Sequence, residues 1–456
     1  MLKLVSDANC WAVAALLACA GCAAIDPYNV IGRQLGGPSE VSNEPVPGPK
    51  KKTLDTGERE AAFRFVWTTI NERYYDPSLN GVDWRGIGER YQPLALKALD
   101  DEVFWDVLDR MTGELRDAHT RVESPRRVEL RKLDQSMTLG FSFAPIQGKL
   151  AVTGVNSATD AWWAGVRPGM TLVAIAGEPA MTAYDRLIAG TRHDSTERSR
   201  HLRAVRRLIA GDEATKVQFT FERGDGSRVD ATLARTTLSY RPSASHRVLP
   251  SGFGYLRLTQ WTLGVMPKAL EGLAELRNTP GIIVDLRGNP GGSLHAVNAM
   301  LSRFFPKRTE LGRILTRTGK PVSVLFGTVE IIKLKAEVDG DPQAYKGPVV
   351  ILVDDSSGSG SEYFAATMQA SGRAVVAGEQ SCGCLLGFLG YAHIPGGAEL
   401  AYSEVGFAMS NGKRIEGEGV IPNHVIPLTL DDLQTNRDRA LEDAQVILRS
   451  LPAWNQ

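Results

Sequence analysis

Residues 349–370 have the sequence VVILVDDSSGSGSEYFAATMQA, which contains the strongest structural signal in the chain. Five consecutive apolar residues, 349–353, are typical of a strand that is buried on both faces. A turn rich in Ser and Gly follows and leads directly into a helical segment. Residues 281–297, GIIVDLRGNPGGSLHAV, repeat this order of apolar strand, tight turn and helix. Two such units indicate βαβ connections and a largely parallel sheet that is covered by helices.

Further segments of the same kind lie on either side along the chain. The runs GYLRL at 254–258 and GRAVVAG at 372–378 are short and apolar, and both are predicted to be buried strands. Residues 429–448, TLDDLQTNRDRALEDAQVIL, are predicted to form one closing helix, because Thr429 is a suitable N-cap and two Asp residues favour the first turn. This part of the chain therefore predicts an α/β core.

Two regions of different character precede this core. Residues 58–121 carry apolar side chains at helical spacing, as in AAFRFVWTTINERYY and EVFWDVLDRMTGEL, and predict helices. Between residues 136 and 234, short β-like runs alternate with Gly and Pro turns and predict a small β-rich domain. We therefore expect an α/β multidomain protein. Its expected parts are a signal peptide (1–21), a flexible tether (22–55), a helical N-terminal domain (56–128), a β-rich domain (129–240), an αβ core (241–430) and a C-terminal helix (431–456).

The composition is that of an ordinary globular protein. The 456 residues are enough for two or three domains with sizeable cores. Lys and Arg number 52, and Asp and Glu also number 52, so the formal net charge at pH 7 is zero. A neutral chain removes the electrostatic argument for binding nucleic acid or an acidic membrane. Five cysteines in a chain of this length do not make a disulfide scaffold.

The N-terminal stretch, MLKLVSDANCWAVAALLACAGCAAID, has the layout of a secretory signal. Lys3 precedes an apolar run at 10–20 that is too short to span a membrane, and no later stretch approaches the ~20 apolar residues of a span. Cys22 follows Ala-Gly, as in a bacterial lipoprotein motif, which predicts a lipid on Cys22. Cleavage after Ala20 without a lipid is the alternative. We expect export from a bacterial cytoplasm to the periplasm, and contact with the membrane only through this N-terminal anchor.

Ser359 lies in the turn between the strand and the helix of residues 349–370. Backbone N–H groups point outward at the N-terminus of a helix, so such a turn can present a hydroxyl nucleophile and stabilise the oxyanion that forms when it attacks a carbonyl. Gly358 and Gly360 leave room for the approach of another backbone. Because parallel strands bring their carboxyl ends to one edge, the turn that contains Gly292 is expected beside Ser359. The alternative is a capped turn without chemistry.

Three motifs together resemble the C-terminal processing, or tail-specific, serine peptidases. They are DLRGNPGG at 285–292, VDDSSGSGSEYFAATMQASGRAVVAGE at 353–379 and NGKRIEGEGVIPNHVIP at 411–427. The resemblance extends over about residues 58–430 and implies a core of the ClpP/crotonase-like αβ fold. It also implies that Ser359 is the nucleophile and that the N–H groups of Gly292 and Gly360 form the oxyanion hole.

The β-rich region resembles the PDZ domain of the same family. TLGF at 138–141 resembles the carboxylate-binding loop of such domains. The run AGVRPG resembles a motif that usually continues with Asp, where this chain has Met170. The resemblance implies that the loop of Leu139, Gly140 and Phe141 binds the C-terminal tail of a protein or peptide, which is added to the sheet as a strand.

The two downstream cysteines bear on the mechanism. In the tail-specific branch of the family a Lys acts as base, and Cys384 stands at that position in this chain. A thiol accepts a proton only as thiolate, and nothing nearby in the sequence lowers the pKa of this thiol, so a Ser–Lys dyad is not expected. Cys382 and Cys384 are expected to be buried thiols or a redox-sensitive pair. A disulfide across one residue closes a small, strained ring and is disfavoured.

The chain instead resembles the tricorn-like branch of the family, which uses Ser, His and Glu. LRDAHTRVES at 115–124 fits a motif of that branch through His119, and Glu416 lies in its E-x-x-G-V motif. The resemblance implies that His119 is the general base on Ser359 and that Glu416 orients the imidazole. The alternatives that remain open for the two roles are His295, His246 and Glu418.

These observations predict an exported serine endopeptidase that takes proteins or peptides as substrates and works through an acyl-enzyme. Asp285 and Arg287 are expected to hold the oxyanion turn together rather than to transfer protons. No cofactor, metal site or nucleic-acid partner is expected, because phosphate-loop motifs, dinucleotide motifs and zinc-type Cys/His spacings are missing from the sequence. The alternative is a non-catalytic scaffold of the same family that binds peptides or hydrophobic ligands.

Overall fold

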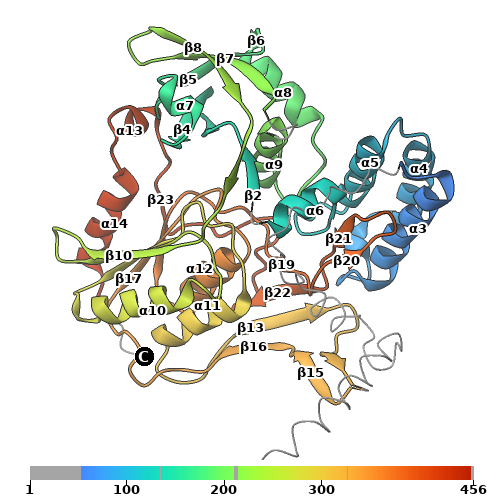
Figure 1. Ribbon diagram of the computed structural model, residues 1–456. Helices are drawn as coiled ribbons and strands as arrows, with labels where there is room; N and C mark the ends of the chain where they lie inside the picture. Colours follow the sequence, from blue (N-terminus) through green and yellow to red (C-terminus); the bar gives the residue numbers. More distant parts are fainter. Residues whose placement is uncertain (1–52, 134, 210–213, 326, 453–456) are drawn as a thin grey trace, which may run out of the picture.

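Figure 1 shows three units in contact: a set of helices from the first part of the chain, a β-rich unit and an α/β core. The computed structural model describes residues 53–133, 135–209, 214–325 and 327–452. The predicted signal peptide, Cys22 and the tether up to residue 52 lie outside the described residues. Within the described ranges, no helix combines the length and the apolar character that a membrane crossing requires.

The core is built on a six-stranded sheet with the order β10-β11-β12-β17-β18-β23. Neighbouring strands from β11 to β23 are parallel and β10 at the edge is antiparallel, which confirms the prediction of a largely parallel sheet. The strands are β10 (Ala244–Val248), β11 (Gly254–Leu258), β12 (Ile282–Asp285), β17 (Val349–Val353), β18 (Val375–Gly378) and β23 (His424–Val425).

Helices cover both faces of this sheet. In β17 the side chains of Val349, Ile351 and Val353 pack with α10, α11 and α12. The side chains of Val350 and Leu352 pack with α14 on the other face, as expected for the alternation of side chains along a strand. The helices are α10 (Met266–Glu275), α11 (Leu294–Leu301), α12 (Gly360–Ala370) and α14 (Arg439–Ser450), with the short 3-10 helices η2 (Leu276–Asn278) and η3 (Ser302–Phe304). The 3-10 helix η1 (Leu79–Gly81) packs among the N-terminal helices instead.

The C-terminal segment forms two helices, so the prediction of one closing helix was wrong. α13 spans Leu430–Gln434, and α14 follows after a break. Thr429 caps α13 as predicted, because its side chain accepts a backbone hydrogen bond in the first turn. Asn436 has a φ of +52°, in the left-handed region that ends a helix, and Asp438 caps the start of α14.

A second, antiparallel sheet of the core was not predicted. Its order is β16-β13-β22-β19, and its apolar side chains, among them Leu311 and Phe407, join the hydrophobic cluster of α11 and α12. The loop from β22 to β23 brings Glu416 to the edge of the central sheet. The strands are β13 (Thr309–Thr316), β16 (Lys335–Val338), β19 (Leu386–Gly387) and β22 (Val405–Met409), and the separate pair is β14 (Val322–Val324) and β15 (Val329–Ile332).

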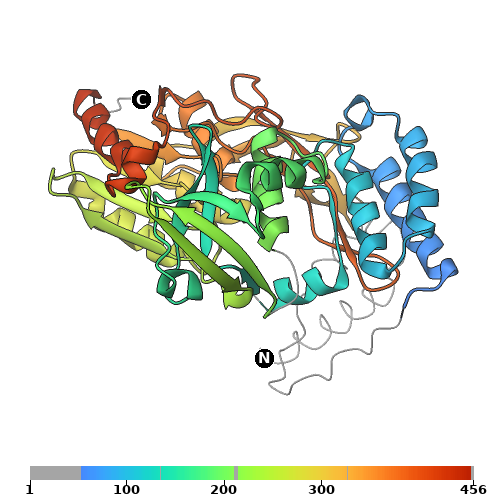
Figure 2. The ribbon, with the colours of Figure 1, turned by 90° about the horizontal axis from the view of Figure 1, so that it is seen from above.

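The N-terminal helices share their hydrophobic cluster with chain from the core region. Leu386, Leu400 and Tyr402 pack among the apolar side chains of these helices. The connection is reinforced because β1 pairs with β21, and β21 with β20. The loop from α5 to β1 is therefore held against the core. Figure 2 shows the N-terminal helices, in blue, at one side of the molecule. The elements are α3 (Thr56–Arg73), α4 (Trp84–Leu96), α5 (Asp101–Gly113), β1 (Arg121–Glu123), α6 (Pro125–Lys132), β20 (Ala392–His393) and β21 (Glu399–Ala401).

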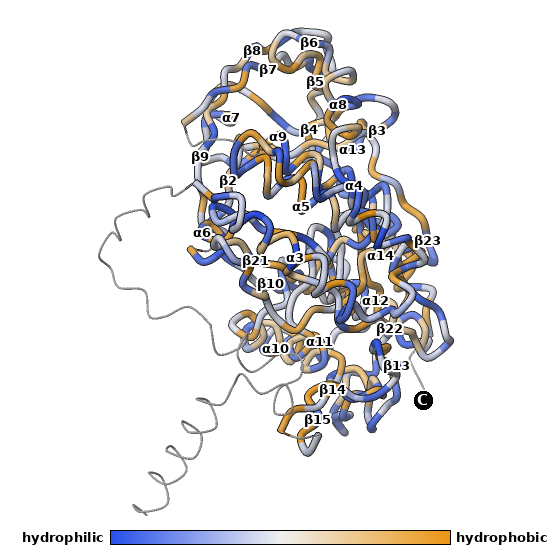
Figure 3. The backbone as a smooth tube through the Cα atoms, turned by 90° about the vertical axis from the view of Figure 1, so that its right-hand side faces the viewer, coloured by the Kyte–Doolittle hydropathy of each residue, from blue (hydrophilic) through white to orange (hydrophobic). Residues whose placement is uncertain are grey.

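The β-rich unit has its own hydrophobic cluster, in which the rings of Phe219 and Phe221 pack edge-on against Phe141 at 5.2 and 5.3 Å between centroids. Figure 3 shows that hydrophobic residues are spread over all three units. The sheet order is β3-β4-β5-β7-β8, so β3 lies at an edge. The elements are β2 (Gln135–Thr138), β3 (Phe141–Ile146), β4 (Lys149–Val155), α7 (Asp160–Trp163), β5 (Thr171–Ile175), β6 (Glu178–Pro179), α8 (Ala180–Ala189), α9 (Glu197–Ile209), β7 (Lys216–Glu222), β8 (Arg228–Ala234) and β9 (Thr236–Ser239).

Candidate active site

Ser359 occupies the turn between β17 and α12, at the carboxyl edge of the central sheet. Its φ of +50° lies in the left-handed region, which is costly for a non-glycine residue and is found where the surroundings hold a side chain in place. The Ser359 N–H donates to Glu362 Oε2 at 3.0 Å and to the carbonyl oxygen of Cys384 at 3.2 Å. These two acceptors stabilise the strained backbone at the N-terminus of α12.

The turn between β12 and α11 lies directly against Ser359, which confirms the prediction made from the parallel topology. A Cβ atom at Gly291 would come within 2.7 Å of both the Ser359 Cβ and the Gly360 nitrogen, so this position requires glycine. The two residues next to Gly292 pair with the backbone of Trp261: the Trp261 N–H donates to the carbonyl oxygen of Gly291, and the Ser293 N–H donates to that of Trp261. The Gly292 N–H takes no part in these two hydrogen bonds. Gly360 is the first residue of α12, and its N–H lies outside the hydrogen bonds of the helix. Two backbone donors therefore lie beside the serine.

Asp285 and Arg287 hold this turn together, as predicted. Arg287 donates from its backbone N–H and from Nε to Asp285 Oδ1, at 3.0 Å in each case. Tyr255 and Arg257 donate to Asp285 Oδ2 at 2.7 and 2.8 Å. Burial alone would raise the pKa of Asp285, but the hydrogen bonds and charge of Arg287 keep this pKa below its usual range. The turn is thus anchored by an ionised carboxylate.

His119 lies between α5 and β1 and reaches Ser359 from the N-terminal helices. Its Nε2 is 3.1 Å from Ser359 Oγ. The Asp117 carboxylate fixes the loop by accepting hydrogen bonds from the His119 N–H at 2.7 Å and from the Ser403 hydroxyl at 2.6 Å. Burial lowers the pKa of His119 to about 4, although the negative charge of Asp117 opposes this shift. The imidazole is therefore neutral at pH 7, and its Nε2 can accept a proton from the serine hydroxyl.

Glu416 lies near His119, on the loop between β22 and β23, but it forms no direct hydrogen bond with the imidazole. The Glu416 Oε1 accepts a hydrogen bond from the Ser195 hydroxyl. Within the part of the chain that the structure describes, neither Nδ1 of His119 nor Oε2 of Glu416 has a hydrogen-bond partner. Burial raises the pKa of Glu416 well above its usual range, and the charge of Asp117 raises it further. The carboxylate is therefore connected to the histidine loop through Ser195.

Two of the three alternative residues form ion pairs away from Ser359, and the third, His295, is exposed. His246 on β10 has its Nε2 at 2.9 Å from Glu275 Oε2. His295 is exposed in the first turn of α11. Glu418 is exposed and pairs with Lys413 at 3.3 Å. Neither of these two ion pairs involves the turn of Ser359.

Cys382 and Cys384 form the disulfide that was disfavoured, so the expectation of buried free thiols was wrong, whereas the alternative of a redox-sensitive pair stays a prediction. The residue between them, Gly383, has a φ of +75°, and this glycine conformation lets the chain turn back so that the two Cα atoms lie 5.4 Å apart. A sulfur in a disulfide is not a base, in agreement with the exclusion of a thiol base. Glu362 lies beside both sulfurs, but sulfurs joined to each other lack the thiolate that binds a metal.

Glu362 is a residue of the site that the sequence analysis missed. It is fully buried in the first turn of α12, where Oε1 accepts from the Gly383 N–H at 2.7 Å and Oε2 accepts from the Cys384 N–H at 2.9 Å. Burial raises the pKa of Glu362 to about 7 against the effect of these hydrogen bonds. A Glu three residues after Ser359 has the spacing of a capping box, and this signal would have found it. Ser195 was also missed, and nothing in its local sequence marks it.

The predicted peptide loop leads into the edge strand β3. The side chains of Leu139 and Phe141 are buried in the cluster of the β-rich unit, and Gly140 turns the chain with a φ of +86°. A cleft of about 610 Å³ lies between this unit and the core. Residues of β3 and α9 line one side of the cleft, and Asp354, Asp355 and other residues at the carboxyl edge of the central sheet line the opposite side.

Comparisons with known proteins agree with this geometry. Residues 252–426 match the profile of peptidase family S41, and residues 55–113 match the tricorn protease C1 domain. The first match contains both turns at the sheet edge, and the second ends shortly before the loop with His119. Fold and site thus define a serine-type peptidase. The α/β core matches peptidase family S41, and relatives named carboxyl-terminal-processing proteases are similar to most of the chain.

Relatives and solved structures with related folds cover most of the chain. The carboxyl-terminal-processing protease of Picosynechococcus sp. is 22% identical over 83% of this chain and 86% of its own length. Tricorn protease homolog 1 of Streptomyces coelicolor is 24% identical over 82% of this chain, which spans only 34% of that relative. The photosystem II D1 C-terminal processing protease is 23% identical, with a TM-score of 0.55 over 87% of this chain and 98% of its own. Mature CPAF complexed with lactacystin is 16% identical, with a TM-score of 0.65 over 86% of this chain and 99% of its own, and both structures indicate a shared fold.

Proposed function

We propose that this protein is an exported endopeptidase that cleaves proteins or peptides through Ser359, His119 and Glu416. The observation that carries the proposal is the distance of 3.1 Å between His119 Nε2 and Ser359 Oγ, which lie 240 positions apart in the chain. A hydroxyl on a strained turn that meets a neutral imidazole is the arrangement of a nucleophile and its base.

In the proposed reaction, Nε2 of His119 accepts the hydroxyl proton while Ser359 Oγ attacks the carbonyl carbon of the scissile peptide bond. The carbonyl oxygen becomes an oxyanion, and the N–H groups of Gly292 and Gly360 donate to it. The intermediate collapses when the imidazolium gives its proton to the leaving amine, and an acyl-enzyme remains on Ser359. Water then attacks the acyl group, the imidazole takes its proton, and the acid product leaves as the serine hydroxyl is restored.

Glu416 is proposed to stabilise the positive charge that develops on His119. Both groups are removed from most of the solvent, so their charges interact more strongly than they would in water. The raised pKa of Glu416 means that nearby donors are needed to keep it ionised, and the Ser195 hydroxyl is such a donor. Asp117 supplies a second negative charge on the histidine loop.

Substrates are proposed to be recognised through their C-terminal tails by the β-rich unit, acting as a PDZ domain. Strand β3 lies at the edge of its sheet, so a tail can pair with it as an additional strand. The loop of Leu139, Gly140 and Phe141 begins this strand, where backbone N–H groups can hold the terminal carboxylate. The cleft of about 610 Å³ beside β3 then extends between the unit and the core.

The N-terminal sequence supports export and a lipid on Cys22, with Ala20 cleavage as the simpler alternative. The disulfide between Cys382 and Cys384 fits this location, because disulfides persist in oxidising compartments such as the bacterial periplasm. A lipid anchor would keep the folded part at the membrane surface through the long N-terminal segment.

A fluorophosphonate probe, which reacts with activated serines, tests the proposal. We expect wild type to be labelled, and Ser359→Ala and His119→Ala to be labelled at least about 10³-fold more slowly, since each removes a member of the catalytic group. His246→Ala is the matched control, because this histidine contacts Glu275 away from the site, and it should be labelled like wild type. Equal labelling of all four proteins, or of none, would exclude the catalytic mechanism and favour the non-catalytic scaffold.

A further inference from the structure

The hydroxyl of Ser195 lies where the three units of the protein meet. Ser195 belongs to the connection between α8 and α9 in the β-rich unit. Its hydroxyl donates to Glu416 of the core and accepts a hydrogen bond at 2.8 Å from the N–H of Ala118, the neighbour of His119. One small side chain therefore connects the carboxylate and the histidine loop of the proposed active site.

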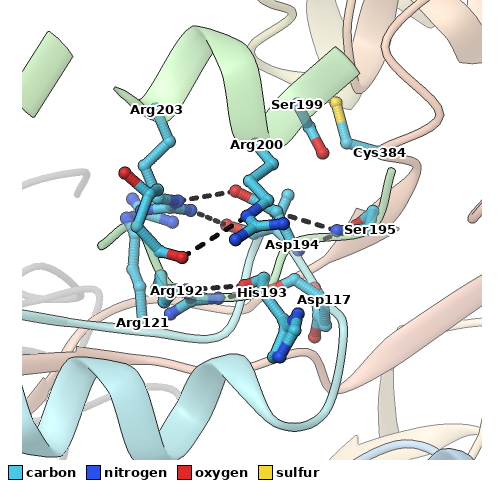
Figure 4. A network of polar contacts seen from close by, with 12 residues as sticks. Asp117, Arg121, Arg192, His193, Asp194, Ser195, Ser199, Arg200, Arg203 and Cys384 are labelled. Carbon is cyan, nitrogen blue, oxygen red and sulfur yellow. Dashed lines mark hydrogen bonds and ion pairs between the residues drawn. The ribbon is translucent and has the colours of Figure 1, made fainter. Parts of the chain in front are cut away.

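The segment that carries Ser195 is anchored to the histidine side. Arg192 is buried, and its guanidinium donates to Asp109 Oδ1 at 2.9 Å and to the carbonyl oxygens of Asp117 at 2.7 Å and Thr120 at 2.9 Å. These two carbonyls lie on either side of His119 in the chain. Figure 4 shows Arg192, Asp117 and Ser195 within one network of polar contacts.

The same segment is anchored to the opposite side of the site. The Thr196 hydroxyl donates to the carbonyl oxygen of Cys382 at 2.6 Å, and Arg198 Nε donates to that of Ser381 at 2.7 Å. Asp194 accepts from Arg203 Nε at 2.6 Å and from the Ser195 N–H at 3.0 Å, which fixes the turn that presents the hydroxyl. The β-rich unit thus contacts both loops that flank the nucleophile.

We propose that Ser195 is a positioning residue that holds Glu416 beside the histidine loop, so that the proposed triad is complete only while the β-rich unit is docked. The inference rests on the proposed function, because it concerns the same triad. The unit proposed to bind the substrate's tail therefore also supplies a part of the active site. A displacement of this unit would remove the Ser195 hydroxyl from Glu416, and it would also break the hydrogen bonds of Thr196 and Arg198 to the loop of Ser381 and Cys382.

The charges around Glu416 explain why one hydroxyl matters. Burial favours the protonated form of Glu416, and the negative charge of Asp117 in the histidine loop adds to this effect. Glu362 of α12 adds to it further as it ionises near pH 7. Tyr74 and Tyr75, at the end of α3, are further titratable groups near it and are neutral at pH 7, because burial raises their pKa values. The hydrogen bond from the Ser195 hydroxyl opposes this by lowering the pKa of Glu416. Without the hydroxyl, Glu416 becomes neutral at higher pH values than in wild type.

The experiment measures kcat and KM of the full chain on a peptide substrate between pH 6 and pH 9. We expect Ser195→Ala to lower kcat about 10- to 100-fold at pH 7, with KM nearly unchanged, because a positioning group acts mainly on the transition state. The loss should decrease as the pH rises and Glu416 ionises. Ser195→Thr keeps the hydroxyl and should restore most of the activity. Ser199→Ala is the matched control, because the Ser199 hydroxyl bonds only to Thr196 within the same segment among the described contacts.

Two results would overturn the inference: full activity of Ser195→Ala at every pH, or a loss that is the same at every pH and is not rescued by Ser195→Thr. If Ser195→Ala does not fold, judged by its melting temperature, Ser195→Cys takes its place, since it keeps the size of the side chain but donates only weakly. Failure of the proposed function is a different result, since the wild-type protein would then not react with the fluorophosphonate probe.

Discussion

The two halves of the proposed active site are built in different ways. Ser359 and Gly292 belong to neighbouring turns of one sheet, and backbone geometry places them. His119, Glu416 and Ser195 come from three units, and side-chain hydrogen bonds bring them together. The first group, which we call the nucleophile half, is therefore determined by local structure. The second group, the base half, is assembled only when the three units are docked.

This difference affects how each half responds to change. The nucleophile half is rigid, because a strained serine and several close glycines leave no space for adjustment. The base half depends on the relative position of whole units, and a shift of about 1 Å in catalytic geometry can cost on the order of 100-fold in rate. Substitutions in the first half should thus act on activity or local stability without affecting docking, and those in the second on activity and docking together.

The largest effect is expected from Gly291→Ala, which tests the rigidity of the nucleophile half. The new Cβ atom would lie 2.7 Å from the Ser359 Cβ and from two backbone atoms of residues 358 and 360, and none of these is the end of a flexible side chain. The turn must therefore move away from the serine. We expect the rate of labelling by a fluorophosphonate to fall about 10³-fold, comparable to the loss of an oxyanion-hole donor.

Gly288→Ala is the matched control for this substitution. Gly288 lies in the same turn with a φ of +72°, but a Cβ atom there would meet nothing within 4 Å. Its strain should cost about 1–2 kcal/mol of stability and leave the labelling rate close to that of wild type. Labelling of Gly291→Ala at the wild-type rate would show that the two turns are not as tightly coupled as the distances indicate.

The nucleophile half is also the half that can be predicted from the sequence. Apolar runs that end in Gly-rich turns identify β12 and β17, and the rules of parallel topology place both turns at one edge of the sheet. The contact between Asp285 and Arg287 can be predicted in the same way, because both residues lie where β12 ends and its turn begins. Local patterns are sufficient because each of these features depends on a few consecutive residues.

The base half was only partly predictable. His119 and Glu416 were indicated by resemblance to a family. No local sequence pattern, however, predicts that a serine of the β-rich unit contacts Glu416. Ser195 is one of many polar residues in a loop, and its role depends on the docking of distant segments. The disulfide of Cys382 and Cys384 was missed for a related reason, since the conformation of Gly383 that permits it depends on its surroundings.

A smaller effect on activity, but a large one on stability, is expected from Arg192→Met, which tests the docking of the base half. The substitution removes the donor to two carbonyls beside His119 and leaves Asp109, a buried carboxylate, without its closest cation. Breaking a buried pair in this way costs about 3–5 kcal/mol. We expect a lower melting temperature and a loss of about 10- to 100-fold in kcat, since catalytic geometry would shift.

Arg85→Met is the control for the loss of an arginine, because Arg85 and Glu89 form an exposed pair on α4. Such a surface pair contributes less than about 1 kcal/mol, so neither stability nor activity should change noticeably. If Arg192→Met behaved like Arg85→Met in both measurements, the base half would not depend on the contact between the units.

The smallest effect is expected at the disulfide, which lies between the two halves. The double variant Cys382→Ser/Cys384→Ser removes a ring that encloses a single residue, and the chain-entropy estimate for such a short loop is only about 1.5 kcal/mol. The backbone N–H groups of Gly383 and Cys384 that donate to Glu362 are unaffected by the change of side chain. We expect kcat within about threefold of wild type, and the same for wild type treated with dithiothreitol, because neither sulfur takes part in proton transfer. A loss of 100-fold or more in both preparations would show that the ring itself holds the Ser359 turn, and the nucleophile half would then depend on a covalent bond as well as on its backbone.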